Sequence, residues 1–521
     1  MFDLKIAGGD VFDGLGSGPV RADVGIAGDR IEKVGDLSGA PARREIDASG
    51  RWVCPGFVDV HSHSDAFLLL EPSAPSKIAQ GITTEVVGNC GASVAPRFGA
   101  RRLPSDWEEH RYPGAWSSVA DYRRLLESVR PAPNVVLLAG HNAIRGCVMG
   151  YEARAARPDE RAAMVRALEQ AMDEGACGLS TGLIYSPGRF ADAGEVLDLA
   201  RVAARRGGIY ATHLRSEGRR LVEALDEAIG IAREAGLRLQ VSHLKTAGRE
   251  NWGLLDAAIG RIERARAEGV DAAADRYPYT ASSTDLDVIL PAWAAAGTRA
   301  EILERLRDPG ARSRLRDELR AERGPDYWTA VRVGSTQAPE NRRHQGRPLV
   351  DVAAEWGLDP ADAALRLIET DELRTGGIFF GMSEENLWRI LALPWVMIGS
   401  DGSLRSPTGP LSLDHPHPRN YGTFPRFLRA AIDGRTVPPA EAIRKMTSLP
   451  ARQFRLRDRG ELREGAFADI AVIDPAEVRD RSTYERPHQL AAGLSWLVIN
   501  GETTIEAGRI ASRRAGRFLN G

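Results

Sequence analysis

The sequence is poor in cysteine, in long apolar runs and in net charge, and each shortage excludes a class of protein. Four cysteines among 521 residues are too few and too scattered for a disulfide scaffold, which favours a reducing compartment. No apolar run is long enough to span a bilayer, and the N-terminus lacks the basic and apolar segments of a signal peptide. The 69 basic and 71 acidic residues nearly cancel, so we expect neither nucleic acid nor a membrane as a partner. We therefore expect a cytoplasmic globular protein.

Apolar runs alternate with amphipathic helical stretches through most of the chain. The runs typical of strands are 57–60, 82–87, 135–138, 176–179, 209–212, 237–242, 270–274 and 395–398. Helical patterns between them include 159–174, 194–206, 219–236 and 254–269. About eight strands with intervening helices predict an α/β fold, a (β/α)8 TIM-like barrel. An open doubly wound sheet is the alternative, but it would not explain why functional-looking residues follow so many of the strands.

The two ends of the chain differ from this alternating region. Short strands joined by Gly and Asp turns mark residues 1–57 and 460–521, and neither segment is long enough to bury a core alone. We therefore predict a small β-sandwich domain built from both termini, and a barrel domain over 58–459.

The barrel is expected to carry an insertion at about 284–393, because one βα crossover does not need this length. We interpret it either as a lid or specificity region near the site mouth or as a subdomain without a role in binding. Within it, Asp359 is expected to cap helix 360–370, with Pro360 at its first position.

Two histidines one residue apart, His61 and His63, follow the first predicted barrel strand. On an extended chain residues i and i+2 point to the same face, so both imidazoles are aimed into one space. Other metal-binding residue types also follow predicted strands, namely Cys90, His213, His243 and Asp401. Imidazole, thiolate and carboxylate groups are good zinc ligands, and a thiolate sulfur can bridge two ions. Each residue alone could be structural, but together the six predict a site for one or two metal ions.

A metal ion at this position would make hydroxide available near neutral pH and would polarise a carbonyl group. Asp401, a carboxylate beside the metal, could take the proton from the attacking water and pass it to a leaving amine. This chemistry is the hydrolysis of a poorly reactive C–N bond.

A set of short motifs spread over nearly the whole chain carries a family resemblance. They are Pro-Gly-Phe-Val-Asp-Val-His-Ser-His at 55–63, Gly-Asn-Cys-Gly at 88–91, Ser-Thr-Gly-Leu at 180–183, Thr-His-Leu-Arg at 212–215, Ser-His-Leu-Lys at 242–245, Tyr-Pro-Tyr at 277–279, Ser-Asp-Gly at 400–402 and Gly-Ala-Phe-Ala-Asp-Ile at 465–470. With them the chain resembles the amidohydrolase superfamily and, within it, the D-aminoacylases (N-acyl-D-amino-acid deacylases). Gly-Asn-Cys-Gly is the sharpest motif, because many relatives bridge their metals with a carboxylated lysine where this subfamily uses a cysteine.

The resemblance implies a role for each candidate residue. Cys90, His213 and His243 would hold one tightly bound Zn²⁺, and His61 and His63 would form a second, weaker site that shares Cys90. Asp401 would be the catalytic acid and base. The implied activity is zinc-dependent hydrolysis of N-acyl-D-amino acids to a D-amino acid and a carboxylate.

The implied partner is a small-molecule substrate with a free α-carboxylate, which the family binds through a Lys, a Tyr and a Ser. The matching positions are Lys245, Tyr277 and Ser283, and one cation with two hydroxyls suits a carboxylate. Lys245 shares the face of His243, two residues before it, whereas Tyr279 and Ser282 remain alternatives for the two hydroxyls.

The side-chain preference of the substrate stays open. A basic residue in the pocket would favour acyl-D-glutamate or acyl-D-aspartate, and an apolar lining would favour acyl-D-methionine or acyl-D-leucine. Met382 hints at an apolar wall, the Arg- and Trp-rich stretch 97–116 suggests a loop over the site, and His141 is a further pocket candidate for which packing is an equal explanation.

Two other functions are considered. One is a cyclic-amide (hydantoinase-like) or dipeptide hydrolase on the same scaffold, and the other is a non-catalytic scaffold protein, which would usually have lost some of the ligands. The number of metal ions in the active form and the oligomeric state are not readable from the residues.

Overall fold

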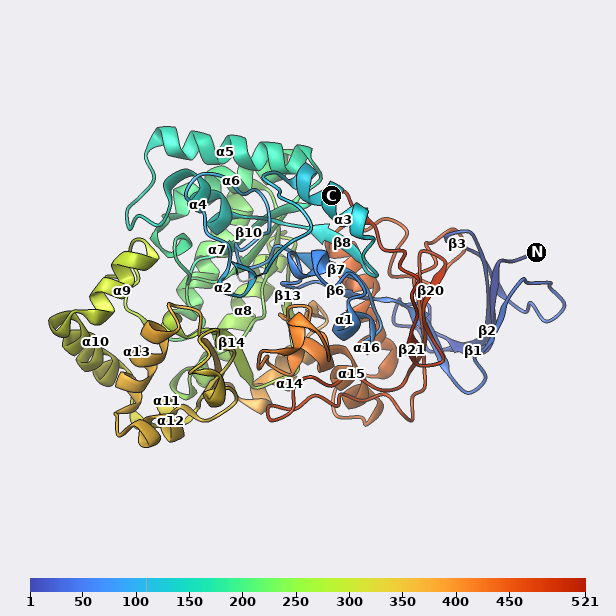
Figure 1. Ribbon diagram of the computed structural model, residues 1–521. Coiled ribbons are helices and arrows are strands. Elements are labelled where there is room, and N and C mark those ends of the chain that lie inside the picture. Colours follow the sequence, from blue (N-terminus) through green and yellow to red (C-terminus); the bar gives the residue numbers. More distant parts are fainter. Residues whose placement is uncertain (109) are drawn as a thin grey trace.

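The computed structural model describes residues 1–108 and 110–521 and has a helix-covered barrel with a β-rich domain at one side (Figure 1). The barrel strands are β6 (Phe57–Asp59), β7 (Ile82–Val87), β8 (Asn134–Leu137) continued by β9 (Ala139–Gly140), β10 (Gly178–Gly182), β11 (Ile209–His213), β12 (Arg238–Val241), β13 (Ala272–Arg276) and β17 (Val396–Ile398). Each pairs in parallel with its neighbour in this order, apart from the one-residue break between β8 and β9.

The barrel closes where its first and last strands meet. A parallel bridge joins Ser62, after β6, to Gly402, after β17. The predicted (β/α)8 barrel is therefore confirmed, and the open doubly wound sheet is excluded because β6 and β17 are joined.

Helices cover the outside of the barrel (Figure 1). They are α1 (Pro75–Ile78), α3 (Val119–Val129), α4 (His141–Met149), α5 (Pro158–Asp173), α6 (Ala193–Arg205), α7 (Leu221–Ala235), α8 (Leu255–Ala267), α14 (Glu384–Ala392), α15 (Arg419–Ile432), α16 (Pro439–Met446) and α17 (Ser448–Gln453). Their apolar stripes pack against the strands; α7, for example, buries Leu225 and Ile229 in the barrel core. The short α2 (Ser105–Glu108) belongs to the loop between β7 and β8. Among the described residues, no helix combines the length and apolarity needed to cross a bilayer.

The segment between β13 and β17 has its own sheet and core. Its strands β14 (Ala281–Asp285), β16 (Gly376–Phe380) and β15 (Val331–Val333) pair antiparallel in that order. Its helices are α9 (Arg299–Arg307), α10 (Pro309–Glu322), α11 (Pro325–Thr329), α12 (Leu349–Trp356) and α13 (Pro360–Thr370). They bury a separate apolar cluster that includes Leu306, Leu319 and Leu365. Asp359 caps α13 by accepting a hydrogen bond from the backbone of Ala361, as predicted.

Strands from both ends of the chain form one continuous sheet (Figure 1). They are β1 (Leu4–Val11), β2 (Val20–Ala27), β3 (Arg30–Gly35), β4 (Glu45–Asp47) and β5 (Trp52–Pro55) from the N-terminal part, and β18 (Ile470–Ile473), β19 (Leu494–Ile499), β20 (Glu502–Glu506) and β21 (Arg509–Ile510) from the C-terminal part. The two parts join where β18 pairs antiparallel with β5. Their shared core contains Ile6, Val24, Ile470 and Val498, so neither part buries its apolar face alone.

The last strand, β22 (Phe518–Leu519), returns to the barrel. It pairs in parallel with β8, Phe518 opposite Val135 and Leu519 opposite Val136. The backbone N–H of Gly521 then donates to the carbonyl of Gly175, close to the start of β10. The end of the chain thus fills the space between β8 and β10 at the amino ends of these strands.

Candidate functional site

The predicted ligands meet at the carboxyl end of the barrel. His61 and His63 follow β6, Cys90 follows β7, His213 ends β11, His243 follows β12 and Asp401 follows β17. Because the barrel strands are parallel, all of these positions lie at the same end, where barrel enzymes carry their active sites.

Four of these side chains converge closely enough to hold one metal ion. The ligand atoms of His61, Cys90, His243 and Asp401 all lie within 4.8 Å of one another, and all four side chains are buried. The Cys90 Sγ is 3.2 Å from His61 Nε2 and 3.6 Å from His243 Nε2. The Oδ1 of Asp401 is 3.2 Å from His61 Nε2 and 3.1 Å from His63 Nε2.

A second group of three candidate ligands shares His243. It consists of His213, Glu217 and His243, whose ligand atoms also lie within 4.8 Å of one another. The two ring nitrogens of His213 are buried without a hydrogen-bond partner among the residues that the structure describes. Burial lowers the pKa of His213, which keeps its imidazole in the neutral form that binds metals.

The backbone is strained at three of the ligands. Cys90, His243 and Asp401 have φ angles of 53°, 36° and 50°, in the left-handed region that non-glycine residues rarely occupy. Such conformations each cost about 1–3 kcal/mol and persist where the surroundings fix them. Here the fixing contacts include the N–H of Asp401, which donates to the His61 carbonyl at 2.7 Å.

The Gly-Asn-Cys-Gly motif forms the tight loop that presents Cys90. Gly88 and Gly91 have φ angles of 79° and 74°, on either side of the left-handed cysteine. A Cβ at Gly88 would stand 2.2 Å from the carbonyl oxygen of Leu138, so only glycine fits there. This geometry explains why two glycines are needed around the cysteine.

Carboxylates orient the imidazoles of two candidate ligands. His61 Nδ1 lies 3.1 Å from Asp275 Oδ1, and His243 Nδ1 lies 2.9 Å from Glu217 Oε1. In both rings the remaining nitrogen, Nε2, faces Cys90. Such a carboxylate–imidazole pair fixes the ring orientation of a metal ligand.

The electrostatics of the site also suit a cation. Burial opposes ionisation of Cys90, but His61 and the hydrogen bonds from neighbouring imidazoles hold the pKa of the thiol well below its usual value. Burial likewise opposes ionisation of Asp401. The pKa of this carboxyl is nevertheless held well below its usual value by nearby histidines and by Arg419, whose Nη1 lies 2.7 Å from Asp401 Oδ2. Imidazoles, a thiolate and a carboxylate around one point form a donor set that fits Zn²⁺.

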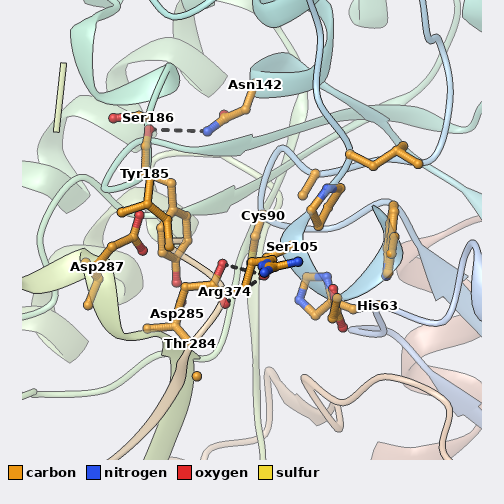
Figure 2. Close-up of a pocket in the computed structure, with 18 of the residues that line it drawn as sticks. His63, Cys90, Ser105, Asn142, Tyr185, Ser186, Thr284, Asp285, Asp287 and Arg374 are labelled. Atoms are coloured by element: carbon orange, nitrogen blue, oxygen red, sulfur yellow. Dashed lines mark hydrogen bonds between the residues drawn. The ribbon is translucent and has the colours of Figure 1, made fainter. Parts of the chain in front are cut away.

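A cavity of about 410 Å³ opens onto this centre (Figure 2). Three residues of the candidate metal centre line this cavity, namely His63, Cys90 and Asp401. Its other lining residues include Arg101–Trp107, Asn142, Tyr151, Tyr185, Arg189, Ser283–Asp285, Asp287, Arg299, Arg374, His417 and Arg419. The stretch 97–116 thus contributes Arg101–Trp107 to the cavity wall, and the segment after β13 contributes Ser283–Asp285. A hydrogen bond joins these two parts of the wall, because Ser105 Oγ donates to Asp285 at 3.1 Å.

The three predicted carboxylate-binding residues lie in different surroundings. Lys245 is buried, with its Nζ 2.8 Å from His243 Nδ1 and in contact with Glu217, and it does not line the described cavity. The hydroxyl of Tyr277 is buried and has no partner among the described residues. Ser283 lines the cavity from β14, whereas Ser282 points to the other face of that strand. Their role in binding substrate stays a prediction.

Two residues that were candidates for the pocket wall, Met382 and His141, make their contacts outside the cavity. The Sδ of Met382 accepts a hydrogen bond from Arg276 at 2.9 Å, and Met382 does not line the cavity, so this residue does not supply an apolar wall. His141 is fully buried with its Nε2 2.7 Å from Glu195, and it serves packing rather than the cavity.

Three residues of the site had not been singled out from the sequence. Glu217 lies four residues after His213, a spacing that could have drawn attention to it. The ring of Tyr185 packs 4.8 Å from that of His213 and faces the cavity, three residues after the Ser-Thr-Gly motif (Figure 2). Arg419 pairs with Asp401 although no motif marks it.

Comparison with known proteins gives a consistent assignment. The sequence profile of the Amidohydrolase family matches residues 44–510. The chain is 40% identical to an N-acyl-D-glutamate deacylase of Alcaligenes xylosoxydans xylosoxydans and 38% identical to a D-aminoacylase of the same organism, in each case over 99% of this chain and at least 96% of the relative. The crystal structure of an N-acyl-D-glutamate deacylase from Bordetella bronchiseptica, in complex with zinc and a phosphonate mimic of the tetrahedral intermediate, superposes with a TM-score of 0.86 at 36% identity and full coverage of both chains. The chain therefore belongs to the amidohydrolase family.

Proposed function

We propose that this protein is a zinc-dependent deacylase, which hydrolyses N-acyl-D-amino acids to a D-amino acid and a carboxylate. The observation that carries the proposal is the buried group His61, Cys90, His243 and Asp401, whose ligand atoms converge within 4.8 Å where a cavity meets the carboxyl end of the barrel. The relatives named above add the substrate class, an acylated D-amino acid.

Five residues from four strand ends would hold the metal ions. Cys90, His213 and His243 would bind the tighter zinc ion, and His61 and His63 would bind a second one, with Cys90 shared. Bound zinc supplies a Lewis acid and a hydroxide available near neutral pH. The two ring nitrogens of His213, which have no hydrogen-bond partner among the described residues, support this assignment, because buried polar atoms normally have a partner.

Asp401 would move the proton in the reaction. Its Oδ2 is held by Arg419 at 2.7 Å, which leaves Oδ1, facing His61 and His63, as the atom that accepts a proton from the attacking water. When the C–N bond breaks, the same oxygen returns this proton to the departing amine nitrogen. The lowered pKa of Asp401 keeps the carboxylate ionised before the reaction.

Lys245, Tyr277 and Ser283 would bind the α-carboxylate of the substrate. The Tyr277 hydroxyl, for which the described part of the chain offers no hydrogen-bond partner, supports this role, since Lys245 and two arginines surround it with positive charge. Arg101 and Arg189 line the cavity together with Asp285 and Asp287, so its charge alone does not select the substrate side chain. The relative at 40% identity is an N-acyl-D-glutamate deacylase. Acyl-D-glutamate is therefore the first substrate to test.

Hydrolysis of a panel of acylated amino acids tests the proposal. The panel contains the N-acetyl derivatives of D-glutamate, D-aspartate, D-methionine and D-leucine, their L enantiomers, a hydantoin and a dipeptide, and the zinc content of each preparation is measured alongside. We expect hydrolysis of the N-acetyl-D-amino acids, fastest for D-glutamate, and no activity in Asp401→Asn. Preference for the hydantoin, the dipeptide or the L enantiomers would refute the proposed substrate class.

The proposed compartment is the cytoplasm. The four cysteines, all within the described residues, are free and buried, which fits a reducing environment. The partner that we propose is the small-molecule substrate itself.

A further inference from the structure

A buried lysine lies next to the strand ends that carry the candidate ligands, and the proposed chemistry does not use it. Lys77 belongs to the short helix α1, and its side chain is 0% exposed. Its Nζ donates to Asp59 Oδ2 at 3.0 Å, Ser62 Oγ at 3.2 Å, Ser400 Oγ at 3.0 Å and the Gly402 carbonyl at 2.8 Å. Lysine is almost never fully buried unless it is paired, so this set of partners needs an explanation.

The partners of Lys77 belong to the two strand ends between which the barrel closes. Asp59 and Ser62 lie on either side of His61, and Ser400 and Gly402 flank Asp401. The carboxylate of Asp59 also accepts from Ser400, at 2.8 Å from the backbone N–H and 2.5 Å from the hydroxyl. The ammonium group therefore lies at the junction of β6 and β17, where Ser62 and Gly402 form the closing bridge.

Charge adds to this network of hydrogen bonds. A second buried carboxylate, Glu85, lies 3.6 Å from Lys77 Nζ and accepts from Ser62 Oγ at 2.5 Å. Lys77 thus faces two carboxylates, Asp59 and Glu85, that are both removed from water. Removal of the cation would leave buried negative charge without compensation, and the two strand ends would be expected to move apart.

These contacts lie on both sides of the strained backbone of Asp401. Asp401 has a φ of 50°, and both of its chain neighbours bond directly to Lys77. The loop after Asp401 is also tied to α1, because Ser76 and Arg405 exchange hydrogen bonds of 3.3 and 2.9 Å. We propose that Lys77 is a positioning residue for Asp401: it fixes the backbone on both sides of Asp401, so that the carboxylate stays against His61 and His63.

A second buried lysine provides a matched control. The side chain of Lys445 is also fully buried, and its Nζ donates to the carbonyl of Leu393. Leu393 precedes β17, whereas Asp401 follows it, so the two lysines bind opposite ends of the same strand. Lys445→Met removes a buried lysine side chain of the same length without touching the site.

Steady-state kinetics of Lys77→Met, Ser400→Ala and Lys445→Met test the inference. With the best substrate of the panel, we expect Lys77→Met and Ser400→Ala to lower kcat by at least about tenfold with little change in KM, because small misplacements of a catalytic group can cost up to about 100-fold. Lys445→Met should stay within about twofold of the wild type in kcat, since single changes away from a site act mainly on stability. A wild-type kcat in Ser400→Ala, or an equal loss of kcat in Lys445→Met, would overturn the positioning role. If Lys77→Met does not fold, the kcat of Ser400→Ala alone tests the inference.

The inference rests on the proposed function, so a second measurement avoids the substrate. The visible spectrum of the cobalt(II)-loaded protein reports the surroundings of the ion, and a carboxylate oxygen of Asp401 lies within 4.8 Å of the ligand atoms of His61, Cys90 and His243. We expect Lys77→Met and Ser400→Ala to change this spectrum and Lys445→Met to leave it unchanged. If the wild type hydrolyses no member of the panel, the proposed function fails, but the spectra still test whether Lys77 positions Asp401. Spectra of Lys77→Met and Ser400→Ala that are identical to the wild-type spectrum would overturn the positioning role.

Discussion

The hydroxyl of Tyr277 is a group whose removal we expect to weaken the enzyme without weakening the fold. Tyr277 follows β13, is fully buried, and has no hydrogen-bond partner for its hydroxyl among residues 1–108 and 110–521. Burial would raise the pKa of Tyr277, but Lys245, Arg276 and Arg419 lower it below its usual value. A buried hydroxyl among three cations, without a protein acceptor, is suited to a substrate carboxylate.

The expected effects of Tyr277→Phe have opposite signs for stability and activity. An unpartnered buried hydroxyl costs about 1–3 kcal/mol, so its removal should leave the midpoint of thermal unfolding of the substrate-free protein unchanged or raised. A hydrogen bond to a carboxylate contributes about 1.5–3 kcal/mol, which corresponds to a loss of about 10- to 100-fold in kcat/KM. Most of this loss should appear in KM, because the carboxylate is bound equally in the ground and transition states.

Tyr279→Phe serves as the control. The Tyr279 hydroxyl is also buried and unpartnered within the described chain, but burial and the nearby Asp480 raise the pKa of Tyr279 well above its usual value, so a carboxylate is not expected there. Thermal unfolding, steady-state kinetics with N-acetyl-D-glutamate, and kinetics with its α-amide are compared for both variants. The Tyr277→Phe loss should vanish with the α-amide. If Tyr277→Phe keeps kcat/KM within about twofold of the wild type, or if Tyr279→Phe loses as much, the assignment of the carboxylate site is wrong.

Four further substitutions follow from the metal centre and the barrel. Cys90→Ala removes the thiol 3.2 Å from His61 Nε2. Structural zinc sites contribute about 10–16 kcal/mol, so the loss of one of the three proposed protein ligands should lower zinc affinity at least about 100-fold. Unchanged zinc content with full activity would contradict the site. His61→Ala or His63→Ala should disturb the second metal position while much of the tightly bound zinc remains, as measured by elemental analysis; a protein emptied of zinc by either change would disprove this division. Phe518→Ala should destabilise the protein by about 3 kcal/mol, because Phe518 is buried where β22 pairs with β8, and an unchanged unfolding midpoint would show that the last strand does not support the barrel.

The barrel and most of the candidate centre could be predicted because their signals are local. Most barrel strands are short apolar runs, and each ligand lies within three residues of the end of such a run. Parallel strands therefore bring His61, Cys90, His243 and Asp401 to one end without knowledge of any long-range contact. The reason for the glycines of the Gly-Asn-Cys-Gly motif is visible only in the structure, where there is no room for a side chain at Gly88.

The parts that could not be predicted depend on contacts between distant segments. Lys77, in a four-residue helix, has no feature in the sequence that distinguishes it from a solvent-exposed lysine, yet it bonds residues more than 320 positions away. Arg419 pairs with Asp401 only because α15 begins at the cavity. The pairing of β22 with the barrel could not be predicted either, since a strand of two residues has no hydrophobic periodicity that identifies it.

The most direct test of the central claim is the zinc dependence of N-acetyl-D-glutamate hydrolysis. The protein is stripped with a chelator, and activity is followed as zinc is added back while bound metal is measured. Since a catalytic zinc supplies the reactive hydroxide, we predict that the stripped protein is inactive and that about one equivalent of zinc restores activity. Full activity in the metal-free protein, or release of no D-glutamate from the zinc-loaded protein, would contradict the account.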